Sequence, residues 1–158
     1  MISQEGEHKP YLWIVISYSG NFRGLGSILK VFPQLVKDTT ILIPIFDSGH
    51  LDIGPEQEAE GWEKKGDCVV IPDVQTMEDF PIAENSEYYL FTDDASLVHV
   101  PTETFVDDLF FVPTDDNHEF WNAIKKVNPE TVIIERDFTF IASKNERLIL
   151  ALKQRFSE

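Results

Sequence analysis

The chain has 158 residues, 42% of them hydrophobic, and a formal net charge of −15 at pH 7. This length and composition suit a single domain with a sizeable core, whereas binding to nucleic acids or anionic membranes is disfavoured because both would repel the chain. No apolar run approaches the roughly 18 residues that span a bilayer, residues 1–10 lack the apolar segment of a signal peptide, and Cys68 is the only cysteine. We therefore expect a protein of the reducing cytoplasm that has no disulfide bond.

The negative charge is concentrated in the middle of the chain. Residues 51–120 contain 19 acidic and two basic residues, a net charge of −17. Residues 1–50 contain four acidic and four basic residues, and residues 121–158 contain five acidic and seven basic residues. The sequence therefore predicts a block of negative potential between two nearly neutral flanks.

The first part of the chain predicts a strand followed by a helix. Residues 1–10 are polar and predict a flexible N-terminal tail, and the globular domain is expected to cover residues 11–158. The continuous apolar run of residues 11–18, YLWIVISY, is typical of a strand buried on both faces of a sheet. A glycine-rich connection then leads to an amphipathic helix over residues 28–36, for which Ser27 is the expected N-cap.

Prolines modify the elements that follow. Pro33 predicts a kink in the helix or its true start. Residues 39–46 predict a second strand, which Pro44 would place at a sheet edge or end early. The patterns beyond it predict a short helix over residues 55–65, strands over residues 67–71, 87–92 and 109–112, and a long surface connection over residues 72–86.

The last third of the chain predicts two capped helices separated by a hairpin. The capping boxes are Asp116 with Glu119 and Ser143 with Glu146. Residues 131–135 and 138–142 predict the two hairpin strands. The buried helix faces are expected to be Phe120, Trp121, Ile124 and Val127 in the first helix, and Leu148, Ile149, Leu152 and Phe156 in the second.

The order of these elements favours the α+β class. Simple alternation of strand and helix is lost after Phe46, which disfavours a doubly wound fold. We expect a single domain in which about three to four helices pack against a mixed β-sheet.

The glycine-rich connection has the position of a phosphate-binding loop, between a strand and a helix. Its glycines, Gly20, Gly24 and Gly26, do not form the dinucleotide-binding pattern, and no lysine precedes Ser27 as a Walker A loop requires. We therefore expect no nucleotide or other cofactor, and a tight connection that needs positive φ angles.

A second candidate lies after the second predicted strand. Asp47, His50 and Asp52 place one imidazole and two carboxylates within six residues, which could support acid–base or metal chemistry. No second histidine stands at ligand spacing, and aspartate is also an ordinary turn residue. These residues are weak candidates for catalysis.

Pairs of aspartates suggest a hard-cation site. Asp93-Asp94, Asp107-Asp108 and Asp115-Asp116 could supply several carboxylate ligands for Ca²⁺ or Mg²⁺. Each pair also borders a predicted element, where solvated turns are common, so we expect no metal. An enzyme remains the alternative hypothesis: a metal-assisted hydrolase, or another enzyme, using Asp47, His50 and Asp52 with an aspartate pair.

The favoured hypothesis is a non-enzymatic protein-binding or inhibitory module whose acidic middle docks a basic protein. Inhibitors of the immunity-protein and antitoxin type share this general size and charge. Glu56, Glu58 and Glu60 are expected to be exposed. The residues expected to bind the partner are Glu78, Asp79, Glu84, Asp93, Asp94, Asp107 and Asp108.

Overall fold

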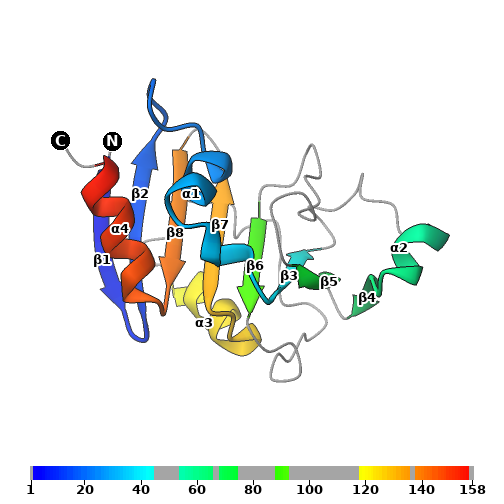
Figure 1. Cartoon of the computed structure of the whole chain (residues 1–158). Helices are drawn as coiled ribbons and strands as arrows, with labels where there is room; N and C mark the ends of the chain where they lie inside the picture. The colour runs from blue at the N-terminus through cyan, green and yellow to red at the C-terminus, as the bar shows by residue number, and fades with distance from the viewer. Residues whose placement is uncertain are drawn as a thin grey trace.

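One antiparallel β-sheet organises the protein. The computed structural model describes residues 2–44, 54–65, 68–74, 88–92, 118–135 and 138–156. Within these ranges eight strands form the sheet in the order β1-β2-β8-β7-β6-β3-β5-β4, and every neighbouring pair is antiparallel (Figure 1). In chain order the elements are β1 (Ile2–His8), β2 (Tyr11–Ser17), α1 (Leu25–Val31), the 3-10 helix η1 (Pro33–Val36), β3 (Thr39–Pro44), α2 (Pro55–Ala59), β4 (Glu63–Lys65), β5 (Cys68–Val74), β6 (Tyr88–Thr92), α3 (His118–Val127), β7 (Thr131–Glu135), β8 (Phe138–Ser143) and α4 (Glu146–Phe156).

The sheet is buried on both faces. Alternating side chains of β2 point to opposite sides, so that Ile14 and Ile16 join one core cluster while Trp13 and Val15 join the other. Helices α1 and α4, with η1, pack on the first face, and α3 packs on the second. The three-layer arrangement confirms the predicted α+β class, and the described strands contain no parallel pair, in contrast to the expected mixed sheet. It also confirms that β2 lies inside the sheet and is covered on both sides.

The N-terminal residues differ from the expected tail, because Ile2–His8 form the edge strand β1 paired with β2. Most of its side chains are exposed, which explains why its polar sequence resembles a tail. Gly6 lies opposite Trp13, and a Cβ at this position would stand 2.6 Å from the indole ring. The ion pair between Lys153 and Glu5, 3.3 Å long, adds a contact between α4 and this edge.

The predicted helix over residues 28–36 is divided in two. Helix α1 ends at Val31, and Pro33 begins η1, as expected for a residue that cannot donate an interior backbone hydrogen bond. The prediction that Ser27 is the N-cap was wrong, because α1 starts at Leu25 after Gly24. The Ser27 hydroxyl instead accepts a hydrogen bond of 2.8 Å from the backbone N–H of Arg23.

Prolines also shape the second half of the sheet. The described part of strand β3 runs to Pro44, and this strand is not an edge because β5 and β6 flank it. Strand β5 continues through Pro72 to Val74, whereas the sequence predicts a surface connection from residue 72. The register between β3 and β5 shifts beside Pro72, and a bulge is a position where a strand tolerates proline.

The two helices in the last third expose one side and bury the other as expected, and the predicted hairpin is confirmed as β7 and β8. The cap of α4 differs from the prediction. The side-chain oxygen of Asn145 accepts the Arg147 N–H at 3.0 Å, whereas the Ser143 hydroxyl accepts the Asn145 N–H. The structure does not describe three of the predicted features. These are the capping box of Asp116 and Glu119, the strand over residues 109–112, and residues 75–86 of the connection.

Candidate functional site

The residues singled out by sequence as catalytic or metal candidates lie outside the described ranges, as do the seven expected partner-binding carboxylates. These are Asp47, His50, Asp52, Glu78, Asp79, Glu84, Asp93, Asp94, Asp107 and Asp108. Among the residues that the structure does describe, no three His, Cys, Asp or Glu side chains gather closely enough to hold a metal ion.

The glycine-rich connection is shaped by a carboxylate. Gly24 has φ of 84°, and a Cβ at this position would stand 2.5 Å from Oε1 of Glu135 at the end of β7. The Glu135 carboxylate accepts a hydrogen bond from the backbone N–H of Leu25, the first residue of α1. A bound phosphate would need such N–H donors, so Glu135 occupies the position that an anion would take. Glycine is required here because the backbone has a positive φ and approaches this carboxylate closely.

Burial raises the pKa of Glu135, and the hydrogen bond from Leu25 lowers it to a smaller extent. The folded protein then holds the Glu135 proton more tightly than the unfolded chain, so this group favours folding increasingly as pH falls from 7 toward the ordinary glutamate value. We expect the wild-type protein to gain stability relative to Glu135→Gln when urea unfolding is measured at pH 7 and then at pH 5. Glu7→Gln, at an exposed position on β1, is the control and should follow the wild type. A wild-type advantage over Glu135→Gln that shrinks on acidification would contradict the assignment.

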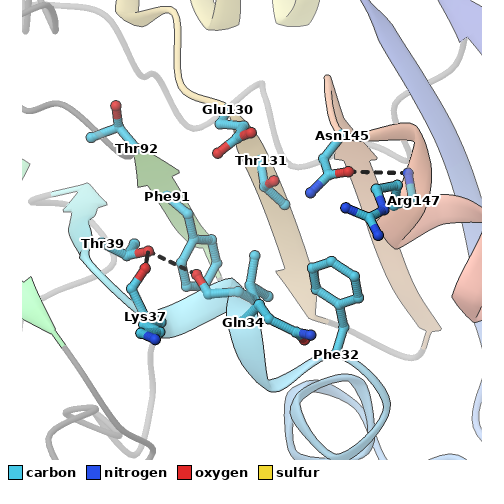
Figure 2. Close-up of a pocket in the computed structure, with 11 residues that line it drawn as sticks. Phe32, Gln34, Lys37, Thr39, Phe91, Thr92, Glu130, Thr131, Asn145 and Arg147 are labelled. Atoms are coloured by element: carbon cyan, nitrogen blue, oxygen red, sulfur yellow. Dashed lines mark hydrogen bonds between the residues drawn. The ribbon is translucent and has the colours of Figure 1, made fainter.

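A pocket of about 280 Å³ opens at the end of the sheet where β6 stops and β3 and β7 begin. Its walls come from η1 and the residues after it, from the ends of these three strands and from the start of α4 (Figure 2). The pocket therefore brings together residues that are far apart in the chain, the first being Phe32 and the last Arg147. Sequence reasoning missed this site because no local motif marks it.

Hydrogen bonds fix several polar side chains of the pocket. The Thr39 hydroxyl faces the carbonyls of Leu35 and Lys37, at 2.9 and 3.1 Å. The Thr131 hydroxyl is 2.8 Å from that of Ser143. These contacts hold the end of η1 against β3 and the start of β7 against β8, so the pocket walls are tied to the sheet.

Three charged side chains line the pocket: Lys37, Glu130 and Arg147. Figure 2 shows Lys37 and Arg147 at opposite sides of the cavity, and both residues are exposed. Within the described part of the chain neither cation forms an ion pair. The pocket therefore carries more positive than negative charge in a protein whose net charge is −15.

The acidic edge is a second surface feature, which we define as the exposed carboxylates Glu56, Glu58, Glu60 and Glu63 in the segment from α2 to β4. Strand β4 is the last strand of the sheet, and Figure 1 shows α2 and β4 at the end opposite β1 and α4. The expected exposure of Glu56, Glu58 and Glu60 is confirmed.

None of the helices described is both long enough and apolar enough to cross a membrane. Comparison with protein-family models, curated proteins and solved structures gives no match. Function is therefore inferred from the chain's own residues.

Proposed function

We propose that this protein is a non-enzymatic binding module of the cytoplasm, of the general inhibitory kind represented by immunity proteins and antitoxins. It docks a basic protein partner through the acidic edge and the acidic segments that adjoin it in the chain. The observation that carries the proposal is the exposure of four carboxylates in the segment from α2 to β4, at one end of the sheet.

The strand order separates most strands of the nearly neutral flanks from the strands of the acidic middle. Strands β1, β2, β8 and β7 come from the nearly neutral flanks, and they form one half of the sheet. Three strands of the other half, β6, β5 and β4, come from residues 51–120, whose net charge is −17. A negative surface on one side of a molecule orients and accelerates encounter with a positive surface on another.

The edge strand is poorly suited to strand addition. Strand β4 has only three residues, Glu63, Lys64 and Lys65, and short charged edges resist pairing with other sheets. We therefore expect recognition through side-chain charge.

A hydrolase using Asp47, His50, Asp52 and an aspartate pair is less well supported. These residues lie outside the ranges that the structure describes. No described observation favours this second function.

Affinity capture from host extract with matched baits tests the proposal. A bait with Glu56→Lys, Glu58→Lys and Glu60→Lys should lose the basic protein that the wild-type bait captures. A control bait with Glu5→Lys, Glu7→Lys and Glu146→Lys makes the same change of charge at exposed positions on β1 and α4, and it should retain that protein. Equal loss from both baits, or retention by both, would refute docking at the acidic edge.

A further inference from the structure

We propose that the pocket between η1 and α4 binds a small aromatic carboxylate, a ligand of about the size of benzoate. This inference is independent of the proposed function, because the pocket residues and the acidic edge do not overlap. It rests on the chemistry of three side chains: Arg147, Asn145 and Phe32.

The Arg147 guanidinium supplies the charge that a carboxylate requires. It is exposed at the pocket wall and has no carboxylate partner among the described ion pairs. A guanidinium offers paired N–H donors whose geometry matches a carboxylate, and such charge-assisted hydrogen bonds are about twice as strong as neutral ones.

The Asn145 side chain adds an oriented donor. Its oxygen is committed to the backbone N–H of Arg147, at 3.0 Å, because Asn145 caps α4. The amide nitrogen must therefore face the other way, and Figure 2 shows it on the pocket side. The cap thus fixes a neutral N–H donor beside the guanidinium, where both can contact one carboxylate.

Aromatic and aliphatic side chains provide the surface for the body of the ligand. Phe32 is half-buried at the wall, while Phe91 and Leu35 are buried beneath the pocket. Figure 2 shows the Phe32 ring near the Arg147 side of the cavity. A ring carrying a carboxylate can pack against Phe32 while its charged end reaches Arg147.

The volume and the remaining charges limit the ligand. A cavity of about 280 Å³ lies near the lower end of the range for small-molecule sites. Lys37 attracts an anion from the opposite side of the cavity, and the Glu130 side chain takes up part of the wall. A compact monocarboxylate satisfies these conditions better than a dianion.

Titration with benzoate, followed by amide chemical shifts of the full chain, tests the inference. Saturable shifts are expected at the pocket residues, and the neutral analogue benzamide should bind at least about tenfold more weakly because it lacks the charge. Inorganic phosphate should also bind more weakly, since it lacks the ring. Failure of benzoate to saturate, or an affinity for benzamide or phosphate equal to that for benzoate, would overturn the assignment.

Arg147→Gln and Arg155→Gln form a matched pair on α4. Both remove one exposed positive charge, but only Arg147 lines the pocket. Arg147→Gln should weaken benzoate binding about tenfold or more, and Arg155→Gln should leave it within about twofold, as expected for screened surface charge. Equal effects of the two variants would show that benzoate responds only to net charge and would refute the site.

The outcome is separable from that of the docking proposal. Arg147→Gln is expected to lose benzoate and to keep the basic partner, whereas the triple reversal of Glu56, Glu58 and Glu60 should lose the partner and keep benzoate.

Discussion

Replacing Trp121 with alanine is expected to lower the free energy of unfolding by about 3–5 kcal/mol, the usual range for a buried tryptophan. Trp121 is 1% exposed at the centre of the cluster between α3 and the sheet. Its ring stacks on His8 of β1 at a centroid distance of 4.5 Å and lies 5.9 Å from Tyr11 of β2. Alanine would thus remove contacts that join α3 to the strands at one end of the sheet.

Urea unfolding of the purified variants measures this loss. Asn122→Ala changes the next residue of α3, which is exposed, and should cost less than about 1 kcal/mol. A loss below about 0.5 kcal/mol for Trp121→Ala would show that α3 does not bury this face.

Leu152→Ala is expected to cost about 2–5 kcal/mol through the opposite face of the sheet. Leu152 is fully buried on α4, in the cluster that also contains Phe22 and Phe156. The same helix offers a control of identical chemistry, because Leu150 is 54% exposed and its change to alanine removes few contacts. The two variants should differ by at least about 1.5 kcal/mol in urea unfolding. Equal losses of stability in the two variants would show that the face of α4 with Leu152 does not pack against the sheet.

The interior of the sheet could be predicted from sequence because its strands are marked by continuous apolar runs. Residues 11–18 predicted a strand buried on both faces, and β2 has this environment. The amphipathic stripes that include Trp121 and Leu152 likewise fixed the phase of α3 and α4. These signals are local, and burial on two faces or on one side of a helix is enough to produce them.

Edges and caps were harder to predict. Strand β1 is polar because it is an exposed edge, and only its pairing with β2 distinguishes it from a tail. Ser27 and Ser143 are residue types that often cap helices. In the structure, however, α1 starts after Gly24, and the side chain of Asn145 caps α4. Cap composition gives the approximate end of a helix, while the position within a residue or two depends on tertiary contacts.

The pocket could not be predicted because its residues are brought together only by strand order. Phe32 and Arg147 are 115 positions apart in the chain. They line one pocket because η1 and the start of α4 both lie at the end of the sheet where β3 and β7 begin. Glu135, which closes the start of α1, was likewise hidden from sequence reasoning, since its hydrogen bond to Leu25 spans 110 residues.

The central claim is that negative charge at one end of the sheet guides a basic partner. The most direct measurement is the rate of association with the captured partner at increasing salt concentration. We expect the rate to fall steeply as ionic strength rises, because screening weakens attraction beyond about 10 Å at 0.1 M salt.

Charge reversal should slow association at least about tenfold at low salt. The positions to reverse are Glu56, Glu58 and Glu60 in one variant, and Asp93, Asp94, Asp107 and Asp108 in a second. The control is reversal of Glu5 and Glu7 on β1, which should leave the rate nearly unchanged. A rate that is insensitive both to salt and to reversal of the acidic residues would contradict the account and reduce the acidic block to a solvated surface.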